Sequence, residues 1–117
     1  MTNHTLDITL NSTGAGATIS VNPVSLDVKD GDSVTITLAW PTNSGNDISC
    51  SLDFNNGSQD PFNDTTNGST SFSVTRSNPS TIVNIMNDAS VGSDSYCITL
   101  TLDGQTYTKD PKIVVKL

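Results

Sequence analysis

A two-residue alternation of apolar and polar side chains constrains this chain more than any other feature. Successive side chains of a β-strand point to opposite faces, so the alternation gives each strand one apolar face. The clearest segment places Val34, Ile36, Leu38 and Trp40 on one face. The pattern recurs over residues 6–10, 19–21, 26–28, 48–54, 72–74, 96–102 and 113–117. No segment shows a convincing helical period, so the chain is predicted to be all-β.

Turn residues and composition support this fold class. Asp30-Gly31 and Asp103-Gly104 each separate two apolar runs, which predicts two tight hairpin turns. Residues 58–66 are predicted as the longest loop. All 12 acidic residues are Asp, and the helix former Glu is absent. We expect a single domain over residues 1–117, a two-sheet antiparallel sandwich of about eight or nine strands, immunoglobulin-like or cupredoxin-like.

Cys50 and Cys97 lie in predicted strands, 47 positions apart. This invites comparison with the disulfide that joins the two sheets of immunoglobulin domains. Cys50 shares the apolar face of its strand, but Cys97 shares its face with Thr99 and Thr101. A bridge between the sheets would therefore need a bulge in one strand. A disulfide between Cys50 and Cys97 and a pair of free thiols both stay open.

The charge and hydropathy of the chain exclude several classes of partner. The net charge of −7 disfavours nucleic acid, because phosphate contacts need clustered Lys and Arg. No apolar run approaches the roughly 20 residues that cross a bilayer, so membrane insertion is not expected. The N-terminus has no signal-like segment, so we expect a cytoplasmic protein, or an exported one whose signal has been removed. The expected partner is an unknown protein or a second copy of the chain.

The ligands of a transition-metal site are scarce in this sequence. Residues 24–38 resemble the start of cupredoxins, but a blue-copper site needs two His and the chain has one, His4. Zinc is disfavoured by the same shortage. Calcium is the least unfavourable metal, because hard oxygen ligands crowd one region. The candidates are Asp53, Asn55, Asp60, Asn63 and Asp64. These residue types are also ordinary in loops, so no cofactor is expected.

No group of residues predicts catalysis. His4 lies near the N-terminus without a paired nucleophile and is expected to be a surface residue. Neither Cys50 nor Cys97 has an adjacent His or Lys that would lower its pKa. No glycine-rich loop opens a helix to hold phosphate. We therefore expect that the protein is not an enzyme.

The C-terminal third carries the most suggestive motifs, SYCITLTLDG over residues 95–104 and DPKIVV over residues 110–115. A Tyr-led strand and turn followed by an Asp-Pro-x-Ile-x-Val strand is similar to the ending of the DP-EP family of uncharacterised bacterial proteins. The resemblance implies a bacterial source and a sandwich fold, but no activity or site. This sequence departs from the family's name in its second half, because no Glu-Pro follows the Asp-Pro at residues 110–111. Pro111 lacks an amide hydrogen, which predicts that residues 113–117 form an edge strand.

These observations lead to one leading hypothesis and one alternative. The function is unknown, and the leading hypothesis is a non-catalytic β-sandwich protein that acts through protein–protein contact. It rests on Thr-rich strands and on the missing catalytic groups. The alternative is a carbohydrate- or calcium-binding module that uses the Asp- and Asn-rich loop 53–67.

Overall fold

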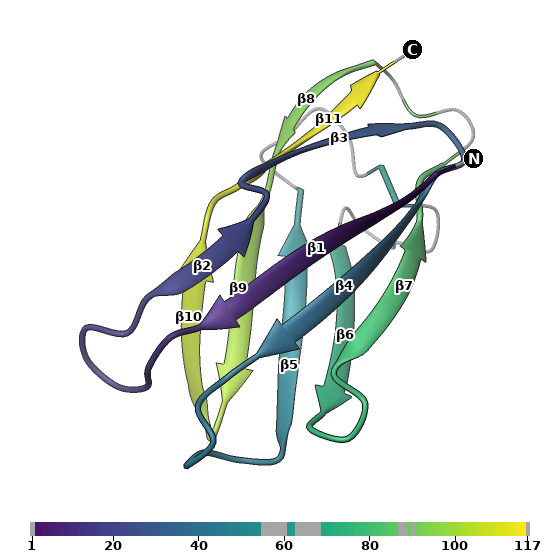
Figure 1. Ribbon diagram of the computed structural model, residues 1–117. Helices are drawn as coiled ribbons and strands as arrows, with labels where there is room; N and C mark the ends of the chain where they lie inside the picture. Colours follow the sequence, from purple (N-terminus) through teal and green to yellow (C-terminus); the bar gives the residue numbers. More distant parts are fainter. Residues whose placement is uncertain (1, 55–60, 63–68, 87–88, 90, 117) are drawn as a thin grey trace.

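The computed structural model describes residues 2–54, 61–62, 69–86, 89 and 91–116, and these residues form eleven strands in three sheets (Figure 1). The front sheet of Figure 1 has the order β2 (Ile19–Asn22), β1 (Asn3–Leu10), β4 (Ser33–Ala39) and β7 (Ser80–Asn84). The rear sheet has the order β10 (Gln105–Lys109), β9 (Cys97–Leu102), β5 (Asp47–Asp53) and β6 (Ser69–Thr75). The third sheet, at the top, has the order β3 (Ser25–Lys29), β11 (Lys112–Lys116) and β8 (Gly92–Ser95).

The core lies between the front and rear sheets and is built from the alternating apolar residues. Ile36 of the front sheet and Leu52 and Ile98 of the rear sheet are fully buried. Every apolar residue on the predicted inward face of these segments is buried within the described residues, except Phe72, which is partly buried. The period-two pattern therefore identified the core, and the all-β sandwich is confirmed.

The third sheet is made of chain segments that continue from strands of the two main sheets. β2 leads into β3 through the cis peptide bond between Asn22 and Pro23. β8 leads into β9 through Tyr96, and β10 leads into β11 through Asp110 and Pro111. The inward side chains of β3 and β11 join the same core, so the third sheet closes the top of the sandwich.

Two strand pairs correct the expectation of a wholly antiparallel sandwich. β1 pairs with β4 in parallel, and β3 pairs with β11 in parallel. The first pairing arises because the chain passes from β2 in the front sheet to β3 in the third sheet and then returns to the front sheet as β4, beside β1 and in the same direction. For this reason Asp30-Gly31 joins two sheets and does not form the predicted hairpin, although Gly31 has a positive φ of 79°.

Other expectations about turns and edges have mixed outcomes. Asp103-Gly104 does form the hairpin between β9 and β10, with φ values of 53° and 79° and Leu102 opposite Gln105. The prediction of an edge strand after Pro111 is wrong, because β11 is the middle strand of its sheet. Pro111 precedes β11 and its carbonyl accepts a hydrogen bond from the amide of Tyr96, so its missing N–H removes no bond from the ladder.

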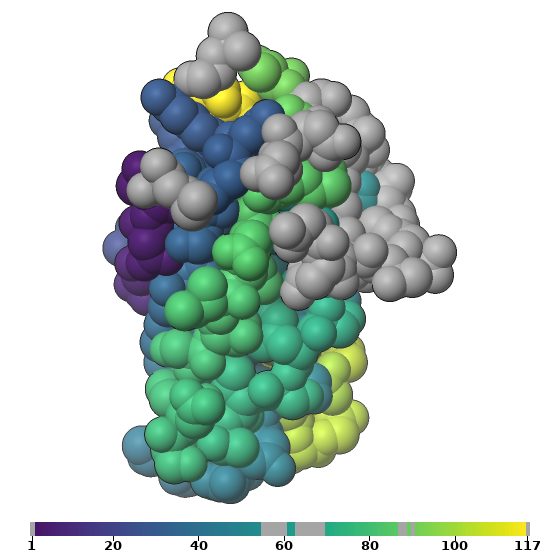
Figure 2. All heavy atoms as spheres, turned by 90° about the vertical axis from the view of Figure 1, so that its right-hand side faces the viewer, coloured from purple at the N-terminus to yellow at the C-terminus, as the bar shows by residue number. Residues whose placement is uncertain are grey.

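The strand count exceeds the predicted eight or nine because some strands carry little apolar signal. β7 buries Val83 but exposes Ile82, and β8 contains only Gly, Ser and Asp. β6 and β7, the edge strands of the rear and front sheets, lie against each other and close one side of the sandwich (Figure 2). Among the described residues, no helix has the length and apolar character needed to cross a membrane.

Candidate functional site

The outer face of the rear sheet carries a set of small hydroxyl side chains, and it points away from the viewer in Figure 1. We name this set the hydroxyl face. Its members are Ser49, Ser51, Ser71, Ser73, Thr99, Thr101, Thr106 and Thr108. Each of the four strands supplies two of them at alternate positions, because the residue between them points into the core or is partly buried against it.

Strand register places these hydroxyls in a regular two-by-four grid. Ser49 lies opposite Ser73 on one side and Thr101 on the other, and Ser51 lies opposite Ser71 and Thr99. The Oγ atoms of Ser49 and Ser73 are 3.0 Å apart, within hydrogen-bonding distance. Neighbouring strands are about 4.8 Å apart and alternate residues of one strand about 6.7 Å apart. The hydroxyls are therefore held in fixed relative positions by the sheet.

The hydroxyl face is slightly hollowed and uncharged. A shallow pocket of about 300 Å³ lies over β9, β5 and β6, lined by six of the eight hydroxyl residues. The nearest acidic residues on β5, Asp47 and Asp53, are its first and last residues and lie at the two ends of the face. No aromatic side chain belongs to this set. The arrangement can donate and accept hydrogen bonds, and its eight members include no acidic, basic or thiol side chain.

The predicted calcium ligand Asp53 occupies a different place, at the end of β5. It lies opposite Cys97 in the register and shares a pocket of about 240 Å³ with Asp110 and Ser95. The other candidates, Asn55, Asp60, Asn63 and Asp64, lie outside the described residues. Within the described part of the chain, no group of three or more His, Cys or Asp is placed to hold a metal ion.

The two cysteines lie in neighbouring strands with different exposure, and both are free thiols. Cys50 is buried opposite Leu100, and burial raises the pKa of its thiol to about 12. Cys97 is half-buried on the outward side, where burial and the nearby Asp110 carboxylate raise the pKa of its thiol. Neither thiol is activated as a nucleophile at neutral pH.

His4 differs from the expectation of a surface residue, because it bonds a buried carboxylate. His4 Nε2 lies 2.8 Å from Oδ2 of Asp32, which is 4% exposed. The amides of Thr2 and Lys29 also donate to this carboxylate, at 2.9 and 3.0 Å. The His4 hydrogen bond is the largest cause that lowers the pKa of Asp32 to about 2. The arrangement ties the start of β1 to the turn after β3.

Sequence reasoning missed the hydroxyl face, Asp110 as a neighbour of Asp53, and the Asp32 cluster. The signal for the hydroxyl face was present, since Ser-x-Ser and Thr-x-Thr occur at 49–51, 71–73, 99–101 and 106–108. That β5 lies between β9 and β6 could not be read from those pairs. The Asp32 cluster joins residues about 30 positions apart and had no local signal.

Comparisons with known proteins assign no family. No family model matches the chain, and no curated protein matches it. The resemblance to the DP-EP family therefore stays a prediction. A search of solved structures finds pseudoazurin from Methylobacterium extorquens AM1, at 15% identity over 95% of this chain and 74% of that chain, with a TM-score of 0.36.

Pseudoazurin is a cupredoxin, one of the two sandwich types that the sequence left open. A TM-score of this size supports no conclusion about activity, ligand or partner. The sandwich assignment rests on the sheets and the core of the chain itself.

Proposed function

We propose that this chain is a non-catalytic β-sandwich module that acts through protein–protein contact. The observation that carries the proposal is the hydroxyl face, an uncharged and slightly concave surface on a protein of net charge −7. The central parts of protein interfaces are depleted of charged residues, because desolvating a charge is costly. A face without charged side chains avoids that cost.

The chemistry of the side chains favours a protein as the occupant. Ser and Thr side chains lose less rotamer freedom on burial than long polar side chains do. Their hydroxyls both donate and accept, so they can bond the backbone amides and carbonyls of a partner. Buried hydroxyls need such bonds, because an unpaired one costs free energy. Phe72, the one aromatic residue that lines the pocket, is partly buried against the core and offers little ring surface for a sugar to stack on, which makes a carbohydrate a poorer fit.

Site-directed cross-linking in extracts of the source cells tests this proposal. A photoreactive side chain replaces Ser71, which is exposed on the hydroxyl face, or Thr5, which is exposed on the front sheet. We expect a discrete protein adduct from position 71, either with another protein or with a second copy, and none from position 5.

Two charged variants serve as the matched pair for this experiment. Ser49→Arg places a cation at the centre of the hydroxyl face and is expected to abolish the adduct. Thr35→Arg places the same cation on a central strand of the front sheet and is expected to leave the adduct unchanged. Equal adducts from both positions, or none from position 71, would overturn the proposal.

Calcium binding is the second candidate, and the pocket shared by Asp53 and Asp110 is the observation that favours it. Carboxylates are the ligands that Ca²⁺ prefers, and a bound ion would stabilise the folded state by mass action. The test compares the melting temperature in millimolar calcium with that in chelator. A rise that disappears in Asp53→Asn but persists in Asp47→Asn supports a site at this pocket, and the absence of any rise removes this candidate.

A further inference from the structure

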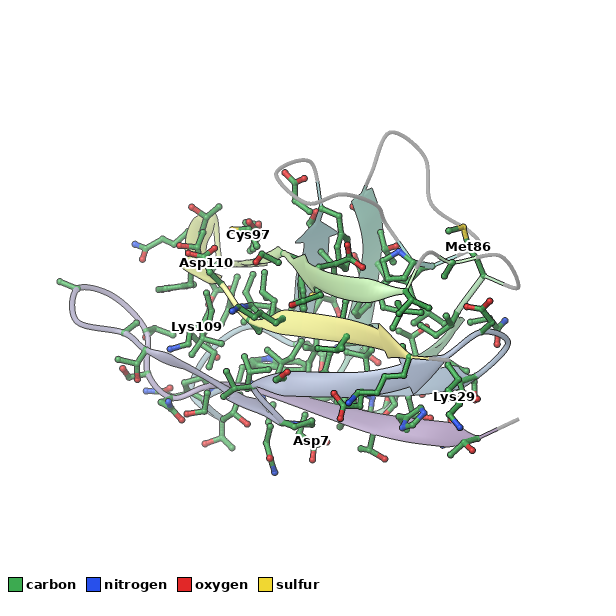
Figure 3. The ribbon with its side chains drawn as sticks, turned by 90° about the horizontal axis from the view of Figure 1, so that it is seen from above. Asp7, Lys29, Met86, Cys97, Lys109 and Asp110 are labelled. Atoms are coloured by element: carbon green, nitrogen blue, oxygen red, sulfur yellow. The ribbon has the colours of Figure 1, made fainter. Side chains whose placement is uncertain are left out.

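Three of the five cationic residues of this acidic chain lie on one sheet, and a fourth lies at its border. Lys29 on β3 and Lys112 and Lys116 on β11 are exposed on the outer face of the third sheet. We name these three residues the lysine strip. Lys109 ends β10 of the rear sheet, three residues before β11 begins, and Figure 3, seen from above, shows Lys29 and Lys109 toward opposite ends of the third sheet. The fifth cationic residue, Arg76, makes a cation–π contact outside this sheet, with its guanidinium 4.9 Å from the centre of the Trp40 ring.

Strand register sets the spacing within the lysine strip. Lys116 lies directly opposite Lys29 in the parallel pair of β11 and β3. Lys112 lies four residues earlier on the same face of β11, which corresponds to about 13 Å along the strand. Val114, between the two lysines, is half-buried and also faces outward. The outward side chains of β11 therefore follow the order cation, apolar, cation.

Little of this positive charge is neutralised within the chain. Lys116 pairs with Asp27 at 3.5 Å, and both side chains are more than half exposed. Among the described residues, Lys29, Lys109 and Lys112 make no ion pair. The strip is thus a local positive surface on a molecule whose net charge is −7.

A small pocket adjoins the end of the strip where the two lysines meet. It has a volume of about 150 Å³ and is lined by Lys29, Lys116 and His4, among others. The two carboxylates in its wall already have partners, since Asp32 accepts three hydrogen bonds and Asp27 pairs with Lys116. A bonded carboxylate still carries its charge, so the two lysines balance the two acids of this wall, and an incoming carboxylate would be held by direct hydrogen bonds from the ammonium groups.

The dimensions of the strip favour one class of partner over other polyanions. It is two strands wide, and the rest of the chain is strongly acidic. A membrane surface or a nucleic-acid duplex extends well beyond the strip. Its negative charges would come within about 8 Å of the surrounding acidic surface, the screening length at physiological ionic strength, and would be repelled by it. A short segment of polypeptide covers the strip alone, where Asp27 is the one acidic side chain of β3 and β11. Side chains four residues apart on an extended segment match the spacing of Lys112 and Lys116 along β11.

We propose that the lysine strip docks an acidic segment of a protein partner, with one carboxylate of that segment seated in the pocket between Lys29 and Lys116. The inference rests on the proposed function in that the partner is a protein, but it uses a different face from the hydroxyl face. The two faces belong to different sheets, so one partner or two can occupy them.

Binding of a labelled octa-aspartate peptide, followed by fluorescence anisotropy at about 20 mM salt, tests this inference. We expect saturable binding that weakens as salt increases and that is absent for octa-serine. Lys29→Gln should weaken binding by about five-fold or more, because it removes a charge at the pocket. Lys109→Gln changes the net charge equally but lies outside the pocket, and it should weaken binding by less than about two-fold.

Competing polyanions and the other face complete the test. Tighter binding of phosphatidylserine vesicles or duplex DNA than of octa-aspartate, with the same loss in Lys29→Gln, would overturn the choice of a protein segment. Equal effects of Lys29→Gln and Lys109→Gln, or no binding at all, would overturn the pocket. Ser49→Arg should leave octa-aspartate binding unchanged, and Lys29→Gln should leave photoreactive position 71 able to form its adduct. The failure of either proposal is therefore visible separately.

Discussion

At the scale of single residues, burial separates the two thiols. Cys50 is 2% exposed and its pKa is raised to about 12, whereas Cys97 is partly exposed. We predict that a thiol reagent at pH 8 modifies Cys97 in the folded protein and reaches Cys50 at least about 100-fold more slowly, because that reaction needs an opening of the core. Counting thiols in native and in denatured protein checks this.

The serine variant of the outer cysteine is the control for that measurement. Cys97→Ser should remove the native reaction and keep one thiol that reacts only in denaturant. Unreduced protein that shows no thiol even when denatured would contradict the free state of both cysteines and favour the disulfide that the sequence left open.

A second residue-scale prediction concerns the buried Asp32. Asp32→Ala leaves three donors, on Thr2, Lys29 and His4, without their carboxylate. Hydrogen bonds to a charged group contribute about 1.5–3 kcal/mol, and unsatisfied buried donors add a penalty. We therefore expect the free energy of unfolding, measured in urea at pH 7, to fall by about 2–4 kcal/mol. Asp7→Ala, on the exposed face of β1, should change it by less than about 0.5 kcal/mol.

The same carboxylate gives a defined pH dependence. The folded pKa of Asp32 is about 2, below its usual value of 3.8, so the unfolded state binds more protons between these values. The stabilisation is present above pH 3.8 and is lost as the pH falls through about 2. The difference in stability between the native chain and Asp32→Ala should shrink over this range, and a difference that stays constant would show that the charge of Asp32 contributes nothing.

At the scale of elements, β11 is expected to hold the third sheet together. It lies between β3 and β8, and its inward residues Ile113 and Val115 are buried. Ile113→Ala should lower the free energy of unfolding by about 2–4 kcal/mol. Val114→Ala on the outward side of the same strand should cost less than about 1 kcal/mol. Urea unfolding checks both.

Deletion of the strand is the stronger form of this test. A chain that ends at Lys109 loses the middle strand, exposes the apolar face of β3 to water and leaves β8 without its partner strand. We expect it to lose cooperative unfolding, seen by the fluorescence of the single Trp40. A shortened chain that melts like the full chain would contradict the placement of β11.

The elements also show what the sequence could and could not reveal. The strand over 33–39 could be predicted because its large apolar residues, Val34, Ile36 and Leu38, alternate with less buried residues and all face the core. The parallel pairing of β1 with β4 could not be predicted from the sequence, because it depends on which sheet β3 joins. Asp30-Gly31 has the same local turn signal as Asp103-Gly104, yet it joins two sheets. The grid of hydroxyls required the order of four strands, which no single strand encodes.

At the scale of the whole molecule, charge is unevenly distributed. The third sheet carries the lysine strip, while exposed Asp7, Asp47 and Asp103 lie on other sheets and turns without a lysine partner among the described residues. Like charges held in a compact fold repel one another, and folding brings them closer than the unfolded chain does. The net charge of −7 therefore opposes folding at low ionic strength.

Screening this repulsion should stabilise the protein. We predict that the free energy of unfolding at pH 7 rises by about 1 kcal/mol between low salt and about 0.5 M NaCl, because the screening length falls to a few ångströms. The double variant Asp7→Asn/Asp47→Asn should be more stable than the native chain at low salt and less sensitive to salt. Lys112→Gln should lower the stability at low salt, since it raises the net negative charge and removes a lysine that attracts the Asp side chains of the chain. A native chain that loses stability as salt is added would show that ion pairs such as Lys116–Asp27 outweigh the repulsion.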